Sequence, residues 1–118
     1  LDASATKSLI ERNAQAVELP PVRECAGLRR ATQAQIDEYL PSHANEDRAD
    51  TWARFYETHA NAKGIMTLSL PGYSEARDIA LVQVMGACGE LCGSGFVWVM
   101  RNEGGRWRFD KAVQGWTN

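Results

Sequence analysis

The chain has 118 residues, of which 44% are hydrophobic and 24% are charged, a composition typical of a globular domain. Lys and Arg total 13 and Asp and Glu total 15, giving a formal net charge of −2. This balance argues against a nucleic-acid partner, because dedicated nucleic-acid binders need a basic excess. The longest unbroken apolar run, residues 96–100, is far shorter than the roughly 20 residues of a membrane span, so no span is expected.

The first half of the chain shows helical periodicity in three places. Ser4 or Thr6 can cap a helix that runs to about Val17, where two prolines follow soon after. Thr32 can cap a second helix, which Pro41 ends. Both segments carry apolar residues at the spacing of a buried helical face.

The third expected helix opens at Asn45 or Asp47 and ends at Gly64, which can adopt the left-handed cap conformation. The acidic residues at its start complement the helix dipole, so we interpret them as a solvated first turn. A stripe of rings would run along one side of this helix, and its members are Trp52, Phe55, Tyr56 and His59. His59 ends the helix, where a cation would interact favourably with the helix dipole.

The second half has the period of strands, which we expect at residues 65–70, 79–87, 94–101 and 106–113. Pro71-Gly72 is expected to form a turn, and Asn102-Glu103-Gly104-Gly105 is expected to form a hairpin turn. The apolar run in the third strand predicts a central strand covered on both faces. Helices followed by strands indicate an α+β fold, with N-terminal helices packed on one face of a four-stranded antiparallel β-meander. With no repeat or low-complexity linker, we expect a single domain over residues 1–118.

Four tryptophans stand out in so short a chain. Trp52, Trp98 and Trp107 fall on apolar faces, so we expect them in the core. Trp116 follows Gly115, where a β-bulge is expected, and it either caps the sheet or joins an exposed aromatic patch. On the last strand, Trp107 and Phe109 are expected to point one way. The charged residues Arg106, Arg108 and Asp110 would point the other way.

Two cysteines enclose three residues in a glycine-rich stretch between two expected strands. If residues 89–91 form a three-residue loop, Cys88 and Cys92 face each other across its closing pair. Opposed residues in such a ladder have Cα atoms about 4.5–5.5 Å apart, and a disulfide needs roughly 4.4–6.8 Å, so a bridge is allowed. The nearby glycines would supply the positive φ angles of a tight tip. They are Gly89, Gly93 and Gly95.

Other interpretations of the cysteines stay open. Two buried free thiols would behave as small hydrophobes. A zinc or copper(I) site could add Cys25 as a third ligand and His43 or His59 as a fourth, although the paired two-residue spacings of zinc sites are absent. A catalytic redox pair is a further alternative, although its usual two-residue spacer is absent as well.

Nucleophilic catalysis would need Cys92 or Ser74 beside a histidine, and nothing in the sequence places such groups together. Phosphate-loop and dinucleotide-binding fingerprints are also absent. The sequence therefore assigns no catalytic residue, no metal site and no cofactor, and it favours a protein that is not an enzyme.

Several short motifs follow one another along the chain, at residues 9–13, 52–56, 64–65, 68–69, 71–74, 80–82, 88–95, 105–107 and 116. The series resembles a family of small, uncharacterised bacterial proteins, often secreted or lipoprotein-like, with a two-cysteine hairpin followed by a Gly-x-Trp strand. The resemblance covers most of the chain. It implies an exported location and favours a Cys88–Cys92 disulfide over free thiols, whereas Cys25 lies outside the pattern.

These observations predict a non-enzymatic, secreted or periplasmic α+β domain that binds a protein or a small ligand. The alternative is a thiol-dependent enzyme, redox protein or metal-binding protein that uses Cys88 and Cys92. The sequence starts at Leu1 rather than at a methionine, as expected if an upstream segment was removed in maturation or trimmed. It does not name the ligand, the partner or the oligomeric state.

Overall fold

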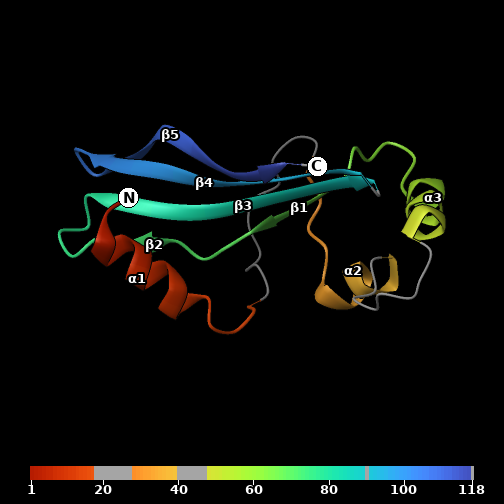
Figure 1. Cartoon of the computed structure of the whole chain (residues 1–118), viewed down its shortest axis with the longest axis horizontal. Coiled ribbons are helices and arrows are strands. Elements are labelled where there is room, and N and C mark those ends of the chain that lie inside the picture. Colours follow the sequence, from red (N-terminus) through yellow and green to blue (C-terminus); the bar gives the residue numbers. More distant parts are fainter. Residues whose placement is uncertain (18–27, 40–47, 90, 118) are drawn as a thin grey trace. The chain divides into compact units, whose positions relative to one another are not determined.

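The computed structural model describes residues 1–17, 28–39, 48–89 and 91–117 (Figure 1). The chain divides into two compact units, which we describe one at a time. One comprises Leu1–Gln15 with Gly64–Asn118, and the other comprises Ala16–Lys63. Helices and an antiparallel sheet are both present, which confirms the α+β class. None of the described helices is long and apolar enough to cross a membrane.

The larger unit contains helix α1 (Ala3–Arg12) and a five-stranded antiparallel sheet rather than the expected four strands. Its path runs β1-β3-β4-β5, with β2 also paired to β3. The strands are β1 (Ile65–Leu68), β2 (Gly72–Tyr73), β3 (Ile79–Gly89), β4 (Cys92–Glu103) and β5 (Arg106–Thr117). The additional strand is β2, because the residues predicted as a turn pair with Leu81 and Ala80 of β3.

Helix α1 begins one residue after Asp2, whose carboxylate accepts hydrogen bonds from the Ala5 amide at 2.8 Å and the Ser4 hydroxyl at 2.6 Å. Asp2, and not Ser4 or Thr6, is therefore the N-cap. The helix also ends earlier than predicted, at Arg12. The side chain of the next residue, Asn13, bonds backbone groups outside the helix. Asn13 bonds both the amide and the carbonyl of Leu70, at 2.8 and 2.9 Å, and so ties the helix end to the chain between β1 and β2.

A small apolar core lies between α1 and one face of the sheet. Ala5 and Leu81 are completely buried and Val99 is 4% exposed, while Leu9, Ile79 and Val97 pack around them. Gly72 permits this close approach, since a Cβ atom there would lie within 2.5 Å of the Ala5 carbonyl oxygen and the Leu9 Cα atom. The helix backbone therefore rests directly on β2.

The opposite face of the sheet is covered far less. Strand β4 is central, as predicted, but it is not covered on both faces, because Trp98 is 37% exposed. Trp107 is 39% exposed, so the prediction that these two tryptophans are core residues is wrong. Burial depends on what lies over a side chain, and among the described elements of this unit the only helix packs on the other face.

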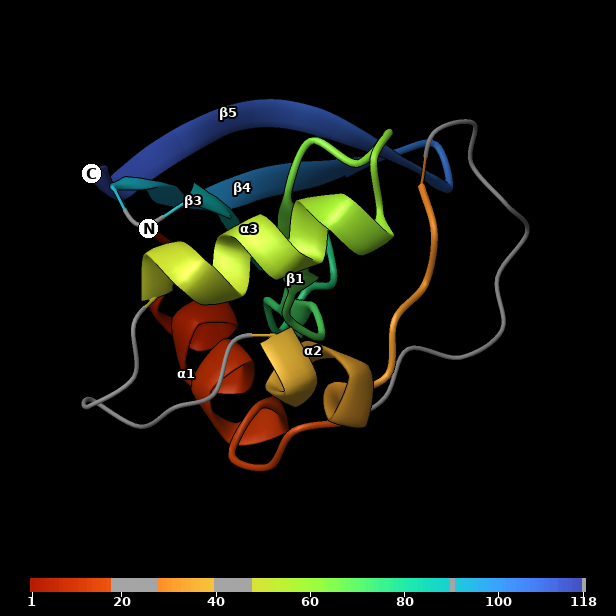
Figure 2. The same ribbon diagram turned by 90° about the vertical axis from the view of Figure 1, so that its right-hand side faces the viewer.

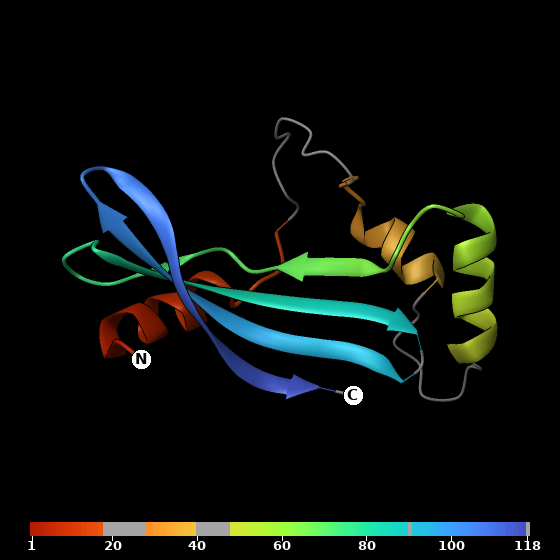
Figure 3. The ribbon, with the colours of Figure 1, turned by 90° about the horizontal axis from the view of Figure 1, so that it is seen from above.

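Strands β4 and β5 form a long hairpin whose two-residue loop is Gly104-Gly105, as the sequence indicated. Both glycines have positive φ, 62° and 86°, which a type I′ turn requires. Register shifts leave Asp110 and Gly115 as extra residues in β5, and the second of these is the expected bulge. Bulges increase local twist, and Figure 3 shows the tip of this hairpin twisted out of line with the rest of the sheet.

The smaller unit contains α2 (Gln33–Tyr39) and α3 (Arg48–Thr58) (Figure 2). Thr32 caps α2 as predicted, since its hydroxyl accepts from the Gln35 amide while the Gln35 side chain accepts from the Thr32 amide. Helix α3 ends at Thr58 and not at Gly64. Its ring stripe is confirmed by centroid distances of 5.1–5.8 Å among Trp52, Phe55, Tyr56 and His59.

The contact between α1 and β2 predicts that Gly72→Ala lowers the free energy of unfolding by about 1–3 kcal/mol, because the new methyl group meets backbone atoms. Gly86→Ala is the matched control, since a Cβ at that position meets nothing within 4 Å. Urea unfolding of both variants measures the difference. Equal losses in the two variants would contradict close packing of α1 on Gly72.

The pKa of the Asp2 carboxyl is lowered from its usual value of 3.8, first by the Ser4 hydroxyl and then by the Ala5 amide. A lowered folded-state pKa stabilises the protein above the unfolded-state pKa, and this contribution is lost as pH falls through the folded-state value. We therefore expect Asp2→Asn to lower the melting temperature at pH 7. At a pH low enough to protonate Asp2 in the folded protein, the melting temperatures of the variant and the parent protein should be equal. A difference that stays constant with pH would contradict this.

Candidate functional site

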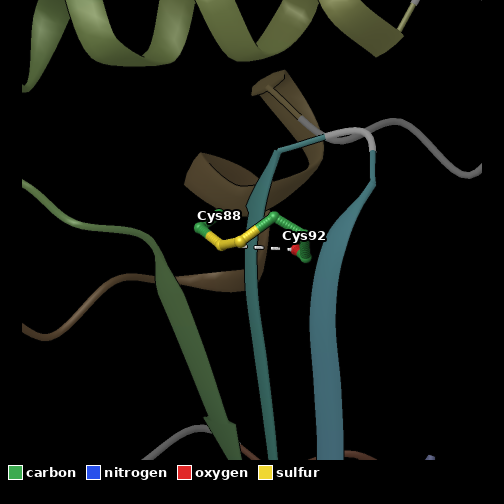
Figure 4. Close-up of a disulfide and its surroundings, with 2 residues drawn as sticks. All are labelled: Cys88 and Cys92. Atoms are coloured by element: carbon green, nitrogen blue, oxygen red, sulfur yellow. Dashed lines mark hydrogen bonds between the residues drawn. A yellow bond between two sulfur atoms is a disulfide. The ribbon is translucent and has the colours of Figure 1, made fainter. Parts of the chain in front are cut away.

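The hairpin between β3 and β4 holds the two cysteines that the sequence singled out. Their sulfur atoms are joined in the structure, and their Cα atoms lie 5.2 Å apart (Figure 4). This separation falls inside the roughly 4.4–6.8 Å that disulfides require. The Cys88 sulfur also lies 3.5 Å from the Cys92 carbonyl oxygen, an acceptor to which a reduced Cys88 thiol could donate.

The register of this hairpin differs by one residue from the expectation. The closing pair is Gly89 with Cys92, so Cys88 does not face Cys92 directly across the ladder. Ala87 pairs with Gly93, which leaves Cys88 as an extra residue in β3. A bulge of this kind bends the strand and redirects its side chain, and here it directs Cys88 toward Cys92.

The glycines of this stretch have a different role from the one expected. Among the described glycines, positive φ occurs at 64, 104 and 105, so Gly93 and Gly95 do not supply it. Instead, a Cβ atom on Gly95 would lie 2.6 Å from the Trp116 indole nitrogen, and one on Gly93 would lie 3.3 Å from the same ring. The Trp116 ring thus lies on two glycines of the neighbouring strand and remains 44% exposed.

The less covered face of the sheet carries a row of rings. Trp98 and Phe109 meet edge to face at 5.7 Å, and Tyr73 and Trp107 lie 5.6 Å apart. As predicted, Trp107 and Phe109 share one face of β5. The Asp110 carboxylate instead accepts a hydrogen bond from Arg101 at 2.9 Å. We call Tyr73, Trp98, Trp107 and Phe109 the aromatic face.

The contact between Tyr73 and Trp107 joins rings from strands that are not neighbours. Tyr73 lies in β2 and Trp107 in β5, two strands separated by β3 and β4. Three strand spacings correspond to about 14 Å in a flat sheet, so the two rings reach toward each other across the sheet. Ala80, the cross-strand partner of Tyr73, is 3% exposed and leaves room for the two rings.

A depression of about 620 Å³ opens beside Tyr73, between the end of α1 and the turn from β2 to β3. Two guanidinium groups reach the same ring, since the Cζ atoms of Arg12 and Arg77 each lie 5.2 Å from the Tyr73 centroid. Ser8, Ser74 and Glu75 complete the lining. We call this depression the arginine pocket.

The arginine pocket was not predicted, because its two arginines are far apart in the sequence and meet only when α1 docks on β2. No sequence pattern indicated it. Arg77 has a φ of 57°, a left-handed value that residues other than glycine and asparagine rarely adopt. The glycine or asparagine usual in such a turn is missing from residues 74–78.

The remaining candidate residues are placed as follows. Cys25 and His43 lie outside the described residues, and His59 packs against Phe55. Ser74 is 5% exposed and its hydroxyl donates to Asp78 at 2.7 Å, so it stabilises the turn rather than acting as a nucleophile. Within the described part of the chain, no three His, Cys, Asp or Glu residues are grouped as a metal site.

Comparison with known proteins gives no further constraint on the site. No family model, curated protein or solved structure matches the chain.

The disulfide closes a very small loop, so we expect a stabilisation of about 2 kcal/mol at most. A double variant, Cys88→Ser with Cys92→Ser, should lose this amount in urea unfolding while keeping the far-ultraviolet circular dichroism of the sheet. Reduction of the parent protein should reproduce the loss and should leave the double variant unchanged. A parent protein whose stability is insensitive to reductant would contradict a structural disulfide.

Proposed function

We propose that this protein is a non-enzymatic α+β domain that binds a protein or a small ligand through the aromatic face. The observation that carries the proposal is the exposure of large rings on one side of a sheet whose other side is covered by α1. Trp98, Trp107 and Phe109 are 37%, 39% and 56% exposed. Large exposed apolar groups that lie together are typical of interaction surfaces, whereas isolated ones are common on any protein.

The geometry of the aromatic face supports binding. Its rings contact one another in pairs, which restricts their rotamers and so reduces the side-chain entropy lost when a ligand is bound. Tryptophan and tyrosine are also the residues that contribute most to binding interfaces.

We also propose that the protein works outside the reducing cytoplasm, in a secreted or periplasmic location. The Cys88–Cys92 disulfide is compatible with this, because disulfides persist mainly in oxidising compartments. The resemblance to small bacterial exported proteins supports the same proposal.

The alternative is thiol chemistry at the hairpin tip, which the exposure of Cys92 favours. A substrate thiolate would attack one sulfur of the disulfide and release the other as a thiolate. This alternative predicts a cysteine with a depressed pKa, which alkylates quickly near neutral pH once the protein is reduced. Mass spectrometry of timed iodoacetamide reactions measures that rate, and slow alkylation of the folded, reduced protein would exclude the alternative.

The aromatic face can be tested with the neutral dye Nile red, whose fluorescence rises on apolar surfaces. We expect Trp98→Ala and Phe109→Ala each to weaken dye binding about tenfold or more, because truncating a central ring removes a large part of the binding energy. Val113→Thr is the control, since this exposed residue pairs with Val97 on the face that carries α1. Equal dye affinity in all three variants would contradict binding at the aromatic face.

A further inference from the structure

The arginine pocket concentrates positive charge around one ring. Because Arg12 and Arg77 each lie 5.2 Å from the Tyr73 centroid, their guanidinium carbons are no more than twice that distance apart. Both side chains are exposed, so solvent and salt weaken their mutual repulsion. An anion beside them would be attracted by both charges.

Neither guanidinium is neutralised by the described part of the protein. Three ion pairs join described residues to one another, and none of them includes Arg12 or Arg77. Glu75 lines the depression without pairing with either arginine. Arg12 donates one hydrogen bond to the Pro71 carbonyl, and a guanidinium has five N–H donors, so most of its donors remain for a ligand.

Hydrogen bonds hold the backbone of the turn that carries Arg77. The Arg77 amide donates to the Ser74 carbonyl at 2.9 Å, and the Ser74 hydroxyl accepts from the Ile79 amide at 3.1 Å. The left-handed φ of Arg77 strains an L residue, whereas glycine would adopt it without strain. Strained positions of this kind cluster at functional sites, and here the strain places an arginine over a ring.

We infer that the arginine pocket binds an oxyanion, the carboxylate or phosphate group of a small ligand, between Arg12 and Arg77. Planar guanidinium groups match both kinds of oxyanion with paired hydrogen bonds. The hydroxyl of Ser8, which accepts from the Tyr73 amide at 3.0 Å, also lines the depression and retains its own proton to donate.

This inference deepens the proposed function, because Tyr73 belongs to both the arginine pocket and the aromatic face. The Trp107 ring lies 5.6 Å from Tyr73 on the side of the sheet that carries the other rings. A ligand with an acidic group in the pocket can therefore extend its apolar part over the aromatic face. The favoured ligand class is an apolar molecule that carries one acid group.

The test is titration of the full chain with sodium phosphate and, separately, with sodium benzoate, followed by amide chemical shifts in NMR spectra. We expect shifts at residues 73–78 and near Arg12. Arg77→Gln should weaken binding about tenfold or more, since it removes charge-assisted hydrogen bonds. Tighter binding of benzoate would identify a carboxylate beside an apolar group, and tighter binding of phosphate would identify a phosphoryl group.

Arg106→Gln is the matched control, because it removes the same charge from an exposed residue of β5 that does not line the pocket. It should leave the affinity unchanged, whereas Glu75→Gln should raise it by removing a nearby negative charge. Arg77→Lys preserves the charge but not the paired hydrogen-bond geometry, so it should also weaken benzoate binding. This variant replaces Arg77→Gln in the test if Arg77→Gln proves unstable.

Equal weakening by Arg77→Gln and Arg106→Gln would overturn the inference, because it would show only a response to net charge. Absence of shifts at residues 73–78 with either probe would overturn it as well. Nile red binding separates this result from the proposed function. If Arg77→Gln binds the dye normally but not the anions, the result supports both the oxyanion site and the aromatic face. If only Trp98→Ala loses dye binding, the result concerns the aromatic face alone.

Discussion

The contact of α1 with Gly72 determines which side of the sheet is covered. A glycine at this position lets the helix backbone lie directly against β2, and Ala5 and Leu81 are then fully buried in the interface. Asn13 fixes the end of the helix to Leu70. With α1 held on that face, the rings on the other face have no covering helix among the described elements of this unit. The aromatic face therefore results from one-sided packing.

The same contact explains how the arginine pocket is assembled. Arg12 lies in the last turn of α1, and its guanidinium bonds the Pro71 carbonyl next to β2. Arg77 approaches from the turn after β2, and both guanidinium groups lie against the Tyr73 ring. Each residue is ordinary in its own segment of the sequence. Their combination depends on a tertiary contact, so sequence periodicity could not reveal it.

Local patterns predicted the parts of the fold that depend on local interactions. The Thr32 cap, the ring stripe of α3, the glycine turn at 104–105 and the bulge at Gly115 all follow from neighbours within a few residues, and the structure contains them. Predictions failed where distant segments intervene. The end of α1 depends on Leu70, the burial of Trp98 depends on what covers the sheet, and Gly72 becomes a strand because it pairs with Leu81.

The disulfide and the arginine pocket lie at opposite ends of β3. Cys88 is next to the last residue of that strand, whereas Ile79, its first residue, bonds the turn that carries Arg77. Strand β3 contains eleven residues, so its two ends lie roughly 33 Å apart along the sheet. Because the disulfide closes so small a loop, we expect its loss to change the hairpin tip and not the packing of α1 on β2. The disulfide therefore stabilises the tip, while the binding that we propose would depend on the charges and rings at the other end.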